Sequence, residues 1–125
     1  MGSQGERRFF WLAVEEETKK IIGTIEYGVA NELIQKTVKE DITNFPEIGT
    51  VFIHPNYQNC GIGSLLLQKI FITLESRNVI GFCLDSGYNQ AQTFWRKKLR
   101  NPNFSLEHYW NNNSHHMIWK RNFTL

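Results

Sequence analysis

Residues 47–77 contain a strand-like segment, a loop with two glycines and an amphipathic stretch, and this succession constrains the fold more than any other part of the chain. The β-branched and aromatic segment EIGTVFI ends two residues before a proline, which lacks the N–H that a central ladder needs. The glycine loop, residues 54–63, carries Gly61 and Gly63. After it, apolar side chains recur at the i, i+3, i+4, i+7 spacing of an amphipathic helix. The segment therefore predicts a strand, a tight loop and a helix in direct succession.

Five further strands and a second helix are predicted around this segment. The segments that predict strands are residues 9–14, 21–28, 79–85, 105–110 and 115–121. Residues 79–85 are apolar on both alternating faces, which is typical of a central, buried strand. Asn89 can cap a helix over residues 89–100, and residues 28–46 predict a loop with one short helix. This order indicates an α+β (mixed α/β) fold with two main helices, one after the third strand and one after the fourth.

Length and composition indicate one domain over residues 1–125, with residues 1–8 as a flexible tail. The chain has 125 residues, 41% of them hydrophobic, which is enough for one packed core and too few for two. A net charge of +2, from 14 basic and 12 acidic residues scattered along the chain, argues against nucleic acid as a partner. Cys60 and Cys83 are expected to be free thiols, and no apolar run is long enough to cross a bilayer. We therefore expect a cytoplasmic protein with no membrane partner.

The glycine loop has the features of an anion site. Backbone N–H groups at a helix start are unpaired, the helix dipole adds partial positive charge, and glycine lets an anion approach the backbone closely. A Walker loop is excluded because Gly63 is followed by Ser64 and Leu65 and not by lysine. A dinucleotide fingerprint is excluded because Leu66 stands where a third glycine is needed. The remaining phosphate-binding pattern is Gln/Arg-x-x-Gly-x-Gly/Ala, which residues 58–63 match as QNCGIG.

Through these residues the sequence resembles the GNAT superfamily of N-acetyltransferases, and the resemblance extends from residue 9 to residue 121. It implies a GNAT-like fold with a central, mostly antiparallel twisted sheet and a single acetyl-CoA-binding domain. The loop residues that it implies hold the pyrophosphate of coenzyme A are Gln58, Asn59, Cys60, Gly61, Ile62, Gly63 and Ser64. The strand residues that it implies bond the pantetheine arm are Val51, Phe52 and Ile53. At a bulge in this strand, a backbone N–H would meet the oxyanion of the reaction.

The resemblance also implies a general base. Glu47 opens the strand before the glycine loop, where several family members place a carboxylate base, and a solvated strand-end carboxylate is the alternative. Such a base would raise the reactive fraction of an amine that is mostly protonated at neutral pH. Glu26 and His54 are further candidates for a chemical role because they lie on or beside the neighbouring predicted strands.

The general acid of the family has no direct counterpart here. Many members carry a tyrosine in the helix after the buried strand, where it returns a proton to the leaving thiolate, but this sequence has Phe94 and Trp95. Tyr88, one turn earlier, or water would then take that role. Asn89 would either contact the pantetheine or only cap its helix.

These features imply an acetyl-CoA-dependent N-acetyltransferase. Such an acyltransferase would move the acetyl group to a primary amine of a small molecule or protein by direct attack in a ternary complex. The alternative is a non-catalytic acyl-CoA-binding or regulatory module of GNAT fold, because the tyrosine is absent. Only about eight residues precede the first strand, where the family usually has a strand and helices. The acceptor groove would therefore be open, completed by residues 28–46, or completed by a second subunit in a homodimer.

Three other groups of residues have simpler interpretations. His115 and His116 are adjacent, so on a strand they would point to opposite faces and not bind one metal, and no metal site is expected. Basic residues at 96–100 fit either the 3′-phosphate of coenzyme A or a solvated helix end. Cys60 fits a small loop residue better than a nucleophile, since no histidine or aspartate arrangement marks it.

Overall fold

A computed structural model describes residues 8–123 of the chain. Its elements are β1 (Arg8–Val14), β2 (Ile21–Gly28), α1 (Glu32–Val38), β3 (Glu47–Ile53), the 3₁₀ turn η1 (Pro55–Tyr57), α2 (Ile62–Ser76), β4 (Gly81–Ser86), α3 (Asn89–Leu99), β5 (Phe104–Asn111) and β6 (Ser114–Asn122). The predicted order of strands and helices is confirmed, including the short helix between β2 and β3. Of the predicted tail, residues 1–7 lie outside the described residues, and Arg8 already belongs to β1. No helix within residues 8–123 is both long and apolar enough to span a bilayer.

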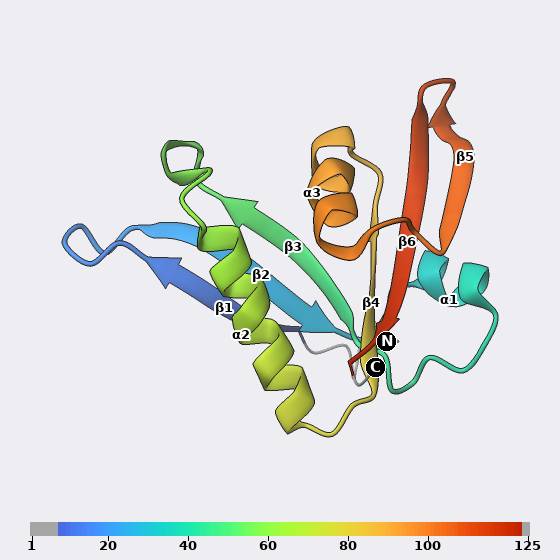
Figure 1. Cartoon of the computed structure of the whole chain (residues 1–125), viewed down its shortest axis with the longest axis horizontal. Helices are drawn as coiled ribbons and strands as arrows, with labels where there is room; N and C mark the ends of the chain where they lie inside the picture. The colour runs from blue at the N-terminus through green and yellow to red at the C-terminus, as the bar shows by residue number, and fades with distance from the viewer. Residues whose placement is uncertain (1–7, 124–125) are drawn as a thin grey trace, which may run out of the picture.

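The six strands form one sheet in the order β1-β2-β3-β4-β6-β5. Neighbouring strands are antiparallel except β3 and β4, which are parallel. Across residues 8–123 the β3–β4 ladder consists of a single pair, Glu47 with Cys83. Beyond that pair the two strands diverge toward Ile53 and Ser86, as Figure 1 shows. The expected mostly antiparallel sheet is confirmed, and it consists of two halves, β1–β3 and β4–β6, joined at one position.

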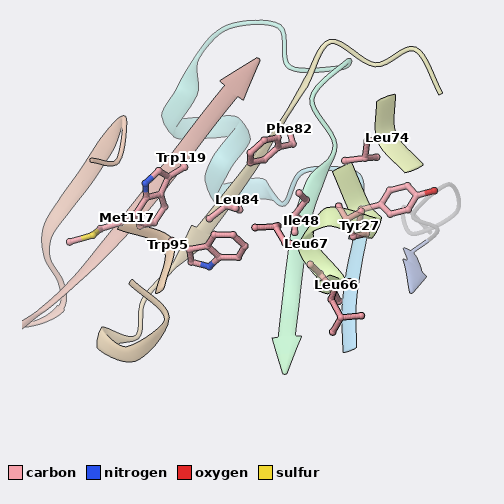
Figure 2. Packing of buried hydrophobic residues seen from close by; sticks show 12 residues of the cluster. Tyr27, Ile48, Leu66, Leu67, Leu74, Phe82, Leu84, Trp95, Met117 and Trp119 are labelled. Atoms are coloured by element: carbon pink, nitrogen blue, oxygen red, sulfur yellow. The ribbon is translucent and has the colours of Figure 1, made fainter. Parts of the chain in front are cut away.

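The larger core lies between the sheet and the helices α2 and α3. The helix α2 packs on β1, β2 and β3, while α3 packs on β6. Of the four periodic apolar residues of α2, Leu67, Ile70 and Leu74 are buried, as their spacing predicts, because this stripe faces the sheet, while Phe71 is only partly buried. Figure 2 shows ten labelled members of this core: Tyr27, Ile48, Leu66, Leu67, Leu74, Phe82, Leu84, Trp95, Met117 and Trp119.

The opposite face of the sheet is covered in part by α1 and the segment after it. A second apolar cluster there consists of Ala30, Ile34, Val38, Ile42, Phe45, Cys83 and Ile118. Successive strand residues point to opposite faces, so Glu47 and Asp85 lie on this second face because Ile48 and Leu84 belong to the larger core. The sheet therefore separates an apolar side from a side that also carries buried carboxylates.

The start of α3 differs from the sequence-based prediction. The N-cap residue is Tyr88, whose carbonyl accepts the first helical hydrogen bond from the Gln92 N–H at 2.9 Å. Asn89 is thus the first residue inside the helix, and no side chain caps this N-terminus. The prediction that Asn89 caps α3 is wrong. The hydroxyl of Ser86 instead accepts the Tyr88 N–H at 3.3 Å in the turn that precedes the helix.

Candidate functional site

The glycine loop connects β3 to α2 through two residues in the left-handed conformation. Asn59 has φ 63° and Gly61 has φ 83°. A Cβ on Gly61 would meet no atom within 4 Å, so the loop is open at this residue. The Gln58 side-chain amide donates to the Ile53 carbonyl at 3.2 Å and ties the loop to the end of β3. This loop therefore exposes backbone without a covering side chain, as close approach of a ligand to the backbone requires.

The first turn of α2 presents backbone donors toward the same loop. Gly61 is its N-cap residue and makes no side-chain capping bond. The first helical hydrogen bond runs from the Leu65 N–H to the Gly61 carbonyl at 3.0 Å, so the N–H groups of the three preceding residues have no helical acceptor. Lys98 of α3 donates from Nζ to Ser64 Oγ at 2.5 Å, which brings a cation to this turn. A helix start with unpaired donors and a neighbouring cation fits a phosphate group.

A bulge interrupts β3 opposite Ile25. Thr24 pairs with Phe52 and Glu26 pairs with Gly49, so residues 50 and 51 of β3 oppose one residue of β2. The bulge lies in the stretch that diverges from β4, so the β4-facing edge of β3 has no ladder pair there within the described chain. An extended molecule with amide groups fits along such an edge by adding to the sheet.

Glu47 lies on the second face of the sheet at the one position where β3 and β4 pair. Its side chain is 10% exposed, its Oε1 accepts the Asn31 N–H at 2.8 Å, and its Oε2 lies 3.9 Å from Nη2 of Arg8. Burial and then the negative charge of Asp85 raise the pKa of Glu47 above its ordinary value of 4.5, against the effects of Asn31 and Arg8. A buried carboxylate with a raised pKa is what a general base near neutral pH requires.

Asn31 links Glu47 to a second carboxylate. Its side-chain amide donates to Oδ2 of Asp85 at 3.1 Å, while its side-chain oxygen accepts the Ile34 N–H and caps α1. Nε2 of His116 lies 2.8 Å from the same Asp85 oxygen. One residue, Asn31, thus bonds the carboxylates on β3 and β4, through its backbone N–H and its side-chain amide, at the place where the two strands begin to diverge.

The sequence matches the acetyltransferase (GNAT) family over residues 3–100, which is most of the chain. The chain belongs to the GNAT acetyltransferase family. This match confirms the family resemblance inferred from the glycine loop. GNAT acetyltransferases transfer an acyl group from an acyl-CoA donor. No curated protein sequence matches the chain.

Solved acetyltransferase structures share this fold. An acetyltransferase from Bacillus cereus superposes with a TM-score of 0.74 at 18% identity, covering 96% of this chain and 76% of that one. The ribosomal-protein-S18-alanine N-acetyltransferase of Escherichia coli gives 0.71 at 19%, covering 99% and 74%. A Bacillus anthracis protein named as a streptothricin acetyltransferase, crystallised with acetyl coenzyme A, gives 0.69 at 14%, covering 96% and 65%. At these identities the comparisons establish the GNAT fold, which confirms the fold expected from the sequence.

The residues considered in connection with proton transfer have very different environments. Trp95, in the stretch where a tyrosine is common, is 4% exposed in the core beneath α3. Tyr88 is 79% exposed at the N-terminus of α3. His54 caps the turn η1, where its Nδ1 accepts the Asn56 N–H at 3.1 Å. His54 therefore has a structural role in the glycine loop, and Tyr88 remains the exposed hydroxyl near the start of α3.

Other candidates are placed as follows. Cys60 is exposed in the loop, and Cys83 is buried, with its thiol donating to the Phe45 carbonyl at 3.3 Å. Glu26 is buried and bonded to Nε of Arg8 at 2.7 Å. His115 approaches exposed Glu107, whereas His116 bonds Asp85, so the two histidines do point to opposite faces.

Several polar residues of the site are not apparent from local sequence patterns. Asn31 precedes a short helix, Asp85 ends an apolar strand, and Arg8 lies in the predicted tail. Their partners are 16 to 54 residues away in the chain, and no spacing motif connects them. A polar residue at the end of an otherwise apolar strand, as at Asp85, is the one signal that could have indicated a functional position.

Proposed function

We propose that this protein transfers the acetyl group of acetyl-CoA to a primary amine of a small molecule or protein, by direct attack in a ternary complex. The observation that carries the proposal is the glycine loop. Its left-handed Gly61 opens α2 without a side-chain cap, next to a strand whose outer half is not paired with β4. The family match and the acetyl-CoA complex of the Bacillus anthracis relative support acetyl-CoA as the donor.

In this proposal the backbone holds the donor. The N–H groups of residues 59–64 would surround the pyrophosphate, with Lys98 beside them. The edge of β3 at Val51, Phe52 and Ile53 bonds the pantetheine amides in place of the missing β4 ladder. At the bulge of residues 50 and 51, which β2 does not match residue for residue, a backbone N–H would stabilise the negative charge that develops on the thioester oxygen.

Glu47 is the proposed general base. An ammonium group must lose a proton before nitrogen can attack, and Glu47 is a buried carboxylate whose raised pKa favours accepting one. Tyr88 is the proposed donor of a proton to the leaving thiolate, with Asn89 close to the pantetheine at the start of α3. The acceptor would approach from the second face of the sheet, because Glu47 lies there.

Thermal unfolding with and without saturating acetyl-CoA tests donor binding, with ATP and NAD as controls. Ligand at about 100 times its dissociation constant adds about 2.7 kcal/mol to the free energy of unfolding. Chains of this length have an unfolding entropy near 0.26 kcal/mol/K, so Tm should rise by about 10 °C with acetyl-CoA alone. A screen of amines for coenzyme A release, with Glu47→Gln as the control, then tests transfer. No shift in properly folded protein would refute donor binding.

A non-catalytic acyl-CoA-binding module is the second candidate. It is favoured by the burial of Trp95 where the family often has a tyrosine hydroxyl. The two functions separate in one experiment, since both predict the acetyl-CoA thermal shift but only the enzyme releases coenzyme A when an amine is added.

A further inference from the structure

The pair formed by Asp85 and His116 is a buried titratable group that the proposed mechanism does not use. Nε2 of His116 lies 2.8 Å from Oδ2 of Asp85, and the two side chains are 9% and 14% exposed. On the other side of the ring, Nδ1 of His116 lies 3.1 Å from Nε1 of Trp110. An indole N–H can only donate, so Nδ1 must carry the lone pair and Nε2 the proton that Asp85 accepts. The contacts on both sides therefore define a single neutral tautomer.

This arrangement is the one that a proton-accepting imidazole requires. In hydrolytic triads an aspartate holds one ring nitrogen, fixes the tautomer and stabilises the imidazolium, while the other nitrogen exchanges the proton. Asp85 holds Nε2 of His116 in this way, and Nδ1 is the nitrogen left for proton exchange.

Trp110 covers Nδ1 from the exposed strand β5. Its side chain is 58% exposed, so it can turn toward solvent at little cost in buried area. Gly87 makes the contact between the rings possible, because a Cβ there would lie 2.6 Å from the indole nitrogen and 3.1 Å from Nδ1 of His116. The absence of a side chain at Gly87 thus leaves room for the contact between Trp110 and His116.

The pair lies beside Glu47 on the second face of the sheet. Asn31 donates to Asp85 Oδ2 at 3.1 Å through its amide and to Glu47 Oε1 at 2.8 Å through its backbone. Both proton-accepting groups are therefore held by one residue where β3 and β4 part. An amine that reaches Glu47 from this face would also be near His116.

We propose that Asp85 and His116 form the second proton-transfer group of the acetyl transfer, uncovered when Trp110 turns away. The proposal rests on the proposed function above. Glu47 takes the first proton, which frees the nitrogen lone pair to bond to the carbonyl carbon. Nδ1 of His116 then takes the second nitrogen proton and returns it to sulfur as the carbon–sulfur bond breaks, and Glu47 releases its proton to solvent. The products are the amide and coenzyme A thiol, so in this proposal His116 takes the place of Tyr88 as the proton donor to the thiolate.

Kinetics of His116→Gln and Asp85→Asn test this role, with His115→Gln as the matched control on the opposite face of β6. General acid–base catalysis contributes about 10²- to 10⁴-fold, so kcat should fall by at least about 100-fold in both variants. The KM for acetyl-CoA and the acetyl-CoA thermal shift should stay at wild-type values, and His115→Gln should keep wild-type kcat. Added imidazole should restore part of the activity of a His116→Gly variant, which a structural role does not predict.

If the wild-type protein acetylates an amine and His116→Gln lowers kcat by less than about threefold, the role of the Asp85–His116 pair is overturned and the proposed transfer stands. A wild-type protein that binds acetyl-CoA but acetylates no amine would refute the proposed transfer, and the pair's role with it. If His116→Gln does not fold, ¹⁵N NMR of the unliganded protein decides. Nδ1 should resonate as an unprotonated nitrogen and Nε2 as a protonated one, and Trp110→Phe should shift Nδ1 alone. A protonated Nδ1 in the neutral ring would overturn the proposal.

Discussion

Replacing Gly61 by alanine tests the glycine loop through both stability and binding. Gly61 has φ 83° and ψ 4°, and a Cβ in the left-handed region costs about 1–2 kcal/mol. The added methyl group would meet no atom within 4 Å, so no clash adds to that cost. With an unfolding entropy near 0.26 kcal/mol/K for 125 residues, Tm should fall by about 4–8 °C.

The same methyl group would project into the open side of the loop, where the proposed pyrophosphate approaches the backbone. Loss of one hydrogen bond to a charged group costs about 1.5–3 kcal/mol, so the Kd for acetyl-CoA should rise at least about tenfold. Isothermal titration calorimetry and thermal unfolding measure the two effects separately.

Two control variants separate an effect on stability from an effect on acetyl-CoA binding. Ile70 is buried in α2 away from the loop, so Ile70→Val should lower the free energy of unfolding by about 0.5–1.5 kcal/mol without changing the Kd for acetyl-CoA. Gly63→Ala lies inside α2, where the new Cβ meets the Phe94 ring at an ordinary 3.5 Å, and should raise stability by up to about 1 kcal/mol. If Gly61→Ala left both Tm and Kd at wild-type values, the reasoning from the left-handed loop would be refuted.

Three further predictions concern the sheet and its buried groups. Glu47→Gln should gain stability relative to wild type as pH rises above about 4.5, because the raised pKa of Glu47 means that wild-type protein loses stability when this carboxyl group ionises in the folded state. Urea unfolding of both proteins at pH 4 and pH 8 measures this. A difference in unfolding free energy between the two proteins that is the same at both pH values would contradict the buried carboxylate. A thiol reagent at pH 7 should modify one cysteine per folded chain and two in denaturant, since burial raises the pKa of Cys83 to about 12 while Cys60 is exposed; mass spectrometry would reveal an error as rapid labelling of Cys83. Trp119→Ala should lower the free energy of unfolding by about 3–5 kcal/mol, because it empties a fully buried site and removes the indole bond to the Arg100 carbonyl, and thermal unfolding should show the loss in Tm.

The elements of this fold could be predicted because each leaves a local signal. The spacing of Leu67, Ile70 and Leu74 predicts α2, and the apolar run at residues 79–85 predicts a central strand, whatever the rest of the chain does. Glu47 could be singled out because it opens the strand before the glycine loop, where the family resemblance implies a carboxylate base, and its role as the base stays a prediction. The N-cap of α3 was misplaced by one residue because Tyr88 and Asn89 differ only in which carbonyl accepts the first helical bond.

The polar contacts of the second face could not be predicted in the same way. Asn31, Asp85 and His116 come from three separated segments, and their contacts depend on how α1 packs beneath β4 and how β6 pairs with it. In the sequence, His116 is one of two adjacent histidines and shows no preference for either face. Strand register decides which histidine is buried, and register is a property of the paired strands rather than of one of them.

The single ladder pair between β3 and β4 also has a consequence for folding cooperativity. Within residues 8–123 the strands of each half-sheet are joined by antiparallel ladders of several pairs, whereas the two halves share one ladder pair and the side-chain core beneath α2 and α3. Amide protons along the diverging edges should therefore exchange with solvent at a lower free energy than those inside either half. An acyl-CoA molecule that bonds to both edges would couple the two halves into one cooperative unit. Its binding would then slow the exchange of amide protons on β3 and β4 together.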